Sequence, residues 1–304
     1  MENKPSSDNG RLLVLDGYNG KILIFDTEGN PLGTLVDDCG GTPDGVCVDP
    51  ENKHVYWTNM GADWKQQDGY IERVSYDRSG RQLIIQKGET TTPKQMQLDL
   101  KNQLIYWCDR EGMRVMRANL DGTGITTLVI SGEGAEGQLD ERRHCVGIAI
   151  DPEAGYLYWT QKGPPNGGSG RISRVAIDLP AGEDPANRKD LEILLKDLPE
   201  PIDLEINHLT HELYWTDRGD PPRGNTLNRI DMHEWDQTEI LTRGLEEAIG
   251  LAMDIENDWV FVTDLSGNIY RSRLDGTTHT KIYSGLNLGQ GFTGIAYVRD
   301  GLGR

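Results

Sequence analysis

The stretch Tyr214-Trp215-Thr216-Asp217 decides the fold, because the chain repeats it. Near-complete copies begin at Tyr56, Tyr106 and Tyr158, so that neighbouring copies lie 50, 52 and 56 residues apart. Self-similarity at a nearly constant spacing of this length indicates a repeat array such as a solenoid or a propeller. The weaker copies of the motif are Leu13-Val14-Leu15-Asp16 and Phe261-Val262-Thr263-Asp264.

Each copy stands in a larger frame of short apolar runs. An upstream run ends in a turn, as in Gly147–Pro152, and a downstream run such as Val115–Asn119 leads into Asp121-Gly122. A fourth run, for example Thr126–Ile130, completes the unit. Asp-Gly between two β-rich runs is a strong hairpin signal. Four short antiparallel strands in each period predict a propeller blade.

The two ends of the chain complete the number of blades. Gly294–Val298 reads as a first strand, whereas Leu12–Leu15, Lys21–Phe25 and Leu32–Val36 read as the second, third and fourth strands of a blade. One blade built from both termini removes free sheet edges, which invite association. We therefore predict an all-β, six-bladed propeller over residues 11–300, with a flexible N-terminus at 1–10 and a short tail at 301–304.

Composition and charge exclude several classes of partner. The 304 residues include 31 Lys+Arg and 49 Asp+Glu, a net charge of −18, so the chain repels a phosphate backbone and we expect no nucleic-acid binding. The longest apolar runs are far shorter than the roughly 20 residues of a membrane helix, and residues 1–8 do not resemble a secretory signal. We expect a cytoplasmic protein without membrane contact. The four cysteines lack CxxC spacing, which favours neither disulfides nor zinc.

The repeated motif is similar to the Tyr-Trp-Thr-Asp repeats of the six-bladed propellers in the low-density-lipoprotein-receptor family, and the resemblance covers residues 11–300. Receptor propellers are flanked by cysteine-rich modules, which this sequence lacks. It therefore resembles the stand-alone intracellular propellers of fungi. That group includes hetero-Diels–Alderases, which are cofactor-free cyclases of polyketide and terpenoid biosynthesis. The resemblance implies a small organic substrate and no cofactor.

Most residues of the motif are expected to hold the scaffold together. Large aromatic side chains bury about 150–250 Å² each, so the Tyr-Trp pairs are expected to pack one blade against the next. The motif aspartates Asp109, Asp217 and Asp264 are expected to accept hydrogen bonds from backbone amides of neighbouring loops. The tryptophans concerned are Trp57, Trp107, Trp159 and Trp215.

Function is expected on the loops of one face. Antiparallel alternation places the connections between second and third strands on the same face as those between blades. Three of these connections, 59–69, 161–170 and 217–225, are long, and the segment 131–144 between blades is longer still. As donors to a substrate carbonyl we predict His144, Lys162, Arg218 and Arg110. As an apolar wall of the substrate site we predict Trp64, Tyr18, Met113 and Phe292.

The innermost strands offer a second clue. Four blades carry Gly followed by a small residue at matched positions, as in Gly45/Cys47 and Gly147/Ala149, whereas the other two carry Gln95/Gln97 and Asp203/Glu205. Polar side chains near a propeller axis are costly unless they are paired or solvated. We expect Gln95, Gln97, Asp203 and Glu205 to bind substituents or water at the floor of a cavity; a water-filled channel without a ligand is the alternative.

Two other motifs are expected to carry no chemistry. Gly132–Gly137 matches G-x-G-x-x-G, but its glutamates would repel phosphate and it falls between two blades. His208 and His211 fall in a short turn on the face opposite the long loops. Asp203 and Glu205 could join a divalent-ion site only with ligands that the sequence does not identify. Besides the cyclase, a peptide- or protein-binding propeller and a metal-dependent, lactonase-like hydrolase remain open.

Overall fold

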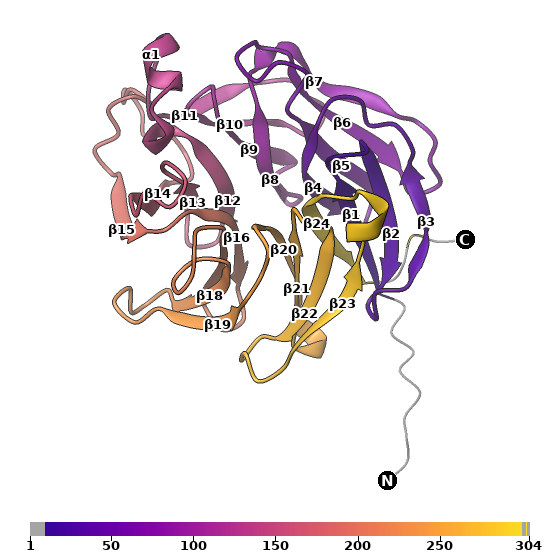
Figure 1. Cartoon of the computed structure of the whole chain (residues 1–304). Coiled ribbons are helices and arrows are strands. Elements are labelled where there is room, and N and C mark those ends of the chain that lie inside the picture. Colours follow the sequence, from indigo (N-terminus) through magenta and orange to yellow (C-terminus); the bar gives the residue numbers. More distant parts are fainter. Residues whose placement is uncertain (1–9, 300–301, 303–304) are drawn as a thin grey trace.

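A computed structural model describes residues 10–299 and Leu302. In it six four-stranded antiparallel sheets stand around a central axis, which confirms the propeller (Figure 1). The N-terminus expected to be flexible, residues 1–10, and the expected tail, residues 301–304, lie outside the described residues apart from Gly10 and Leu302.

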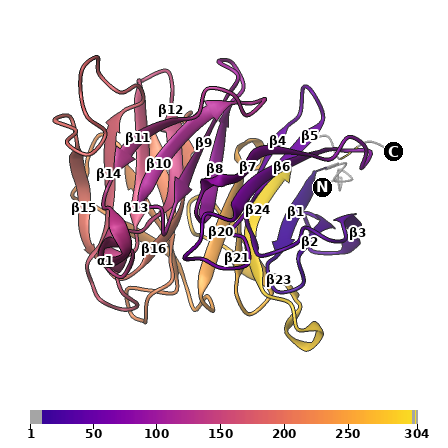
Figure 2. The ribbon, with the colours of Figure 1, turned by 90° about the horizontal axis from the view of Figure 1, so that it is seen from above.

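The blades are numbered along the chain, and the innermost strand of each forms the hub (Figures 1 and 2). From hub to rim, the first blade consists of β24 (Phe292–Val298), β1 (Arg11–Asp16), β2 (Lys21–Asp26) and β3 (Pro31–Val36), and the second of β4 (Pro43–Asp49), β5 (His54–Asn59), β6 (Gly69–Ser75) and β7 (Gln82–Thr90). The third consists of β8 (Pro93–Asp99), β9 (Leu104–Asp109), β10 (Arg114–Asn119) and β11 (Thr126–Ile130), and the fourth of β12 (Cys145–Asp151), β13 (Tyr156–Gln161), β14 (Gly170–Ala176) and β15 (Glu192–Leu198). The fifth consists of β16 (Pro201–Asn207), β17 (Glu212–Asp217), β18 (Thr226–Asp231) and β19 (Glu239–Arg243), and the sixth of β20 (Ala248–Asp254), β21 (Trp259–Asp264), β22 (Asn268–Arg273) and β23 (His279–Ser284).

The first blade closes the ring with both ends of the chain, as the sequence predicts. β24 pairs antiparallel with β1, and Leu13 stands opposite Ala296. Every innermost strand therefore has a hydrogen-bonded neighbour in its own blade, and the N-terminal and C-terminal strands hold each other in place.

The tyrosine and the tryptophan of each motif pack in opposite directions. Trp57 is fully buried against Leu13 and Leu15 of the preceding blade, whereas Tyr56 packs in the cluster that contains Trp107 of the following blade. The same division holds for the motifs of the third, fourth and fifth blades. Each pair thus joins three successive blades, which confirms the scaffold role expected for these residues.

The threonine of the motif joins neighbouring innermost strands. The Thr160 hydroxyl accepts a hydrogen bond from the Gly147 amide (2.7 Å) and donates one to the Ile202 carbonyl of the next blade (2.8 Å). Thr58 and Thr216 make equivalent pairs of bonds in the second and fifth blades. We call each of these arrangements a hydroxyl bridge. One hydroxyl thereby provides hydrogen bonds to buried backbone groups of two neighbouring blades.

Glycine in the third position of an innermost strand allows the next blade to approach. A Cβ atom added at Gly147 would collide with the Ile202 carbonyl oxygen, and one at Gly45 would meet the backbone of Lys94 and Gln95. Where the third residue is Asp203, its carboxylate instead accepts a hydrogen bond from the Leu251 amide of the sixth blade (2.9 Å).

Outside the sheets, α1 (Gly134–Gln138) and the 3₁₀ turn η1 (Glu141–Arg143) lie in the segment between the third and fourth blades. The sequence did not predict this helix. Two further 3₁₀ turns are η2 (Ile255–Asn257), between β20 and β21 of the sixth blade, and η3 (Leu286–Leu288), between β23 and β24. All four cysteines are free thiols. Within residues 10–299, no helix has the length and apolar character needed to cross a membrane.

Gly147→Ala is expected to lower the free energy of unfolding by roughly 3 kcal/mol or more, because backbone rather than a flexible side chain meets the new methyl group. The matched control is Gly182→Ala, where φ is +80° and the space around the residue is open, so only about 1 kcal/mol of backbone strain is expected. Urea denaturation of both variants checks this. Equal losses would show that the close approach of the blades does not limit stability.

Candidate functional site

The loops on which function is expected gather at one end of the hub, which we call the mouth. There the loops between second and third strands meet the segments that enter each blade. The amide of Met60 donates to Thr42 (2.8 Å), that of Arg110 to Thr92 (3.0 Å) and that of Arg218 to Glu200 (2.9 Å). The motif aspartates fix the same segments, since Asp109 accepts from the amides of Thr91 and Thr92, as expected. Asp217 and Asp264 accept backbone amides in the same way.

A buried ion pair stands at the mouth between the second and third blades. The Lys94 ammonium contacts the Asp44 carboxylate, and Gln95 donates to the same carboxylate (3.2 Å). Burial lowers the pKa of Lys94 to about 8 although Asp44 opposes the shift, and the charges of Arg110 and Arg218 lower it further. Arg110 and Arg218 are therefore close enough to Lys94 to disfavour its charged form.

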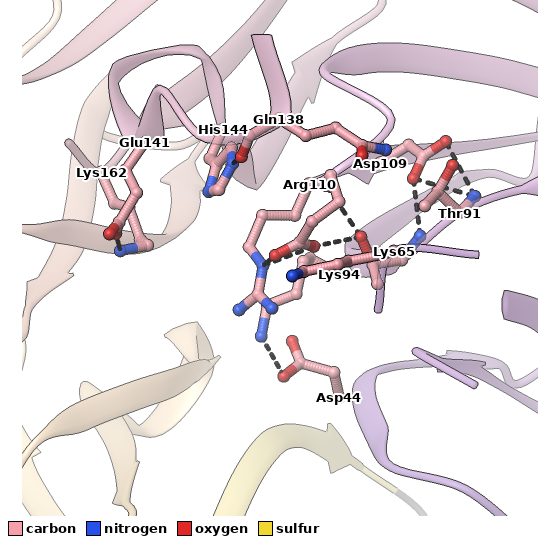
Figure 3. A network of polar contacts seen from close by, with 12 residues as sticks. Asp44, Lys65, Thr91, Lys94, Asp109, Arg110, Gln138, Glu141, His144 and Lys162 are labelled. Carbon is pink, nitrogen blue, oxygen red and sulfur yellow. Dashed lines mark hydrogen bonds and ion pairs between the residues drawn. The ribbon is translucent and has the colours of Figure 1, made fainter. Parts of the chain in front are cut away.

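Arg110 lies between a carboxylate and an aromatic ring. Its Nε donates to Glu111 at 2.7 Å, and its guanidinium lies 4.8 Å from the centre of the Trp64 ring. Thr92 donates to the same Glu111 carboxylate. Figure 3 shows Arg110 and Lys94 on one side of the opening and Lys162, Glu141 and His144 on the other. Trp64 itself is 46% exposed, so its free face is available to a ligand.

On the opposite side Glu200 holds two cations. Lys162 contacts Glu200 at 3.3 Å and Glu141 at 2.5 Å, and Arg218 contacts the same Glu200 carboxylate. Lys162 and Glu200 are buried, whereas the Arg218 side chain is partly accessible. Of the predicted donors, Lys162, Arg218 and Arg110 are thus brought together at the mouth.

His144 has a different place. Its Nε2 lies 2.9 Å from the Gln138 carbonyl, its Nδ1 is buried without a partner, and burial lowers its pKa. A neutral imidazole that donates from Nε2 has no second N–H for a substrate carbonyl. The geometry therefore ties His144 to the segment that contains α1 rather than presenting it as a free donor.

The predicted apolar wall is divided among several places. Tyr18 is 65% exposed on the β1–β2 loop. Met113 is buried beside Gly132, which precedes α1, and Gly137, which lies in α1. Phe292 is buried in the core beside Phe25 and Tyr283. An apolar cluster that sequence reasoning missed occupies the second position of three innermost strands, at the level of Lys94. Its members are Val146, Ile202 and Ile249, with Leu265 packed against them.

The polar residues of the innermost strands do not share one floor. Gln95 belongs to the mouth, and Asp203 is bound by the amides of Leu204 and Leu251. Gln97 and Glu205 line two hollows at the other end of the hub. The expected common floor is therefore corrected to two separate levels.

The metal-dependent alternative needs further ligands beside Asp203 and Glu205. Within residues 10–299 and Leu302, no group of three or more His, Cys, Asp and Glu side chains is placed to hold a metal ion. His208 and His211 fall in the turn between β16 and β17, as the sequence indicates.

Fold and hub together define a six-bladed propeller of Tyr-Trp-Thr-Asp repeats. No protein-family model matches the chain. It is 42% identical to a protein of Pyricularia oryzae described as low-density lipoprotein receptor-related protein 1, over 98% of this chain and 100% of that protein. It is 38% identical to the 3-hydroxyacyl-CoA dehydrogenase-like protein LAM1 of Cochliobolus heterostrophus, over 95% of this chain but only 63% of that protein. The propeller in a crystal structure of a nidogen/laminin complex has a TM-score of 0.75 and 21% identity, over 96% of this chain and 99% of that one. The chain belongs to the family of six-bladed propellers with low-density-lipoprotein-receptor YWTD repeats.

Lys94→Met is expected to cost roughly 3–5 kcal/mol of unfolding free energy, because it leaves Asp44 buried without its cation. Adding Asp44→Asn is expected to restore part of that loss. Lys281→Met removes an exposed pair with Glu246 and is expected to cost less than about 1 kcal/mol. Chemical denaturation of the three variants checks this. A Lys94→Met loss as small as that of Lys281→Met would show that the mouth is not organised by a buried pair.

Proposed function

We propose that the chain binds a small organic molecule at the mouth and catalyses its cyclisation without a cofactor, by a hetero-Diels–Alder addition. The observation that carries the proposal is the convergence of four cations from three blades on one end of the hub of a strongly acidic protein. These cations are Lys94, Arg110, Lys162 and Arg218.

The cations have two kinds of role. Lys94 and Lys162 are buried and paired, so they set the local potential. Arg110 and Arg218 are partly accessible, and a guanidinium has five N–H groups, so donors remain beyond those used for Glu111 and Glu200. A carbonyl oxygen that gains negative charge in the transition state would accept hydrogen bonds from these arginines.

The proposed addition joins a conjugated enone, such as a quinone methide, to an alkene. One carbon–oxygen and one carbon–carbon bond form while three π bonds become one, so no atom leaves and no electron is supplied. Rate enhancement then comes from holding the two reactants about 3–3.5 Å apart and from polarising the carbonyl. The exposed part of the Trp64 ring would contact the hydrocarbon part. Val146, Ile202 and Ile249 are buried and pack against one another.

One observation favours a second function, recognition of a peptide or protein. Leu286 and Leu288 of η3 are 64% and 67% exposed, and Tyr18 is exposed beside them. The two segments are in contact, since Asn19 donates to the Gly289 carbonyl (3.2 Å) and the Tyr18 ring covers Gly291. An exposed apolar patch of this kind is typical of partner-binding surfaces.

The cyclase proposal is tested with an ortho-quinone methide released in solution and a cyclic terpene alkene. The protein is expected to change the rate and the stereoisomer ratio of the adduct, read by chiral chromatography. Arg110→Met and Arg218→Met are each expected to lower the catalysed rate about 10- to 100-fold, because each removes a donor to the developing oxyanion.

The matched control is Arg142→Met, which removes an exposed guanidinium paired with Asp140 and is expected to leave the rate unchanged. An adduct with the rate and stereoisomer ratio of the reaction without protein would overturn the cyclase proposal. In that case Leu286→Ser and Leu288→Ser become the relevant changes for the partner-binding function.

A further inference from the structure

The end of the hub opposite the mouth contains two adjoining hollows. One has a volume of about 230 Å³ and is lined by β4, β8, β16, β20 and β24. The other has a volume of about 490 Å³ and is lined by β8, β12 and β16. The larger volume falls within the roughly 300–1,000 Å³ that is usual for small-ligand sites.

Gln97 and Glu205 lie in the wall that the two hollows share. The Gln97 amide donates to the Glu205 carboxylate at 3.0 Å, from the third blade to the fifth, past the small Ala149 of the fourth. This hydrogen bond therefore forms a polar partition between the hollows. Because it joins two side chains and no backbone, rotation of either side chain would open one hollow to the other.

Apolar surface predominates in the larger hollow but not in the smaller one. Val46, Met253 and Ile295 line the smaller hollow, and Leu98 and Ile206 line both. The polar groups that a guest meets in the shared wall are one carboxylate and one carboxamide. Such walls suit a compact apolar body with a single polar substituent.

The charge around Glu205 favours a cation as that substituent. Its hydrogen-bond partner Gln97 is neutral, and burial raises the pKa of Glu205 to about 7. The facing titratable groups are Asp203 on its own strand and Cys47 on β4. Repulsion between Glu205 and these two groups disfavours further negative charge, and a bound cation would reduce that repulsion.

The rim of the larger hollow also favours cations. Asp99, Asp151 and Glu153 line it together with Lys101 and His208. Three carboxylates against one lysine and one histidine, in a chain with net charge −18, attract cations towards this end of the hub.

We propose that this end of the hub is a second binding site, for an apolar small molecule that carries one protonated amine. The ammonium group contacts Glu205 and replaces or joins the Gln97 amide, and the apolar body fills the hollow between Leu98, Ile150 and Ile206. The site is independent of the cyclase proposal, because it uses neither the cations nor the loops of the mouth.

The experiment uses three compounds with one body and different head groups: 1-adamantanamine, 1-adamantanol and 1-adamantanecarboxylate. Calorimetric titration at pH 8 is expected to show the amine binding at least tenfold more tightly than the alcohol, with no binding of the carboxylate. Equal binding of the three compounds, or no binding of the amine, would overturn the proposal.

Variants locate the site. Glu205→Gln is expected to weaken amine binding at least tenfold and to leave alcohol binding within threefold. The control Glu234→Gln removes an exposed carboxylate outside both hollows and is expected to change both less than threefold. Gln97→Met keeps the carboxylate and removes its partner, so amine binding is expected to be retained or strengthened even if Glu205→Gln folds poorly. Two results would contradict the assignment: loss of amine binding in Gln97→Met, or unchanged amine binding in a folded Glu205→Gln.

The pH dependence of amine binding gives a further check. Between pH 8 and pH 5 Glu205 becomes protonated while the amine stays charged, so amine binding is expected to weaken. Glu205→Gln removes this carboxyl group, so amine binding by that variant is expected to vary less between pH 8 and pH 5. Arg110→Met at the mouth is expected to leave amine binding unchanged, which distinguishes failure here from failure of the cyclase proposal. A pH dependence that is identical in Glu205→Gln would contradict the role of Glu205.

Discussion

The hydroxyl bridge is the interaction on which the hub depends. Each bridging threonine satisfies an amide of its own blade and a carbonyl of the next, so it fixes how far apart two innermost strands can stand. In two blades whose motif lacks the threonine, another side chain bonds to the carbonyl of the next blade. In the third blade Cys108 takes the place of threonine and its thiol points to the Gly147 carbonyl (3.3 Å). In the first blade the residue is Leu15, and Thr293 on β24 supplies the hydroxyl to Pro43 (2.9 Å).

This constraint gives the hub two ends with opposite chemistry. Glycine at the third position brings the innermost strands together between the mouth and the lower hollows. Above that level, carboxylates hold cations such as Lys94 and Lys162. Below it, Glu205 lies among aliphatic side chains with only a neutral amide as its hydrogen-bond donor. The two proposals therefore predict different head groups, a hydrogen-bond-accepting carbonyl at the mouth and an ammonium at the opposite end.

The repeated elements could be predicted from the sequence, whereas the arrangement of charge could not. A motif such as Tyr214–Asp217 recurs from blade to blade, so the number of blades and the closure by β24 followed from its spacing. The close approach of the blades at the matched glycines did not. Asp44 and Lys94 pair across two blades, and a single blade contains no signal for that pairing. Gln95 and Gln97 were assigned to one floor, but two residues along a strand are almost 7 Å apart, which separates the mouth from the hollow.

Native-state hydrogen exchange tests the central claim most directly, because the amides of Gly45, Gly147 and Asp203 donate to the bridging threonines. If the bridges hold the hub as one unit, these three amides exchange only through global unfolding and respond equally to added denaturant. Exchange at the rates of the outer strands β3 and β23, with a different response for each of the three amides, would show that the innermost strands open separately. The hub would then not be the fixed frame that both sites require.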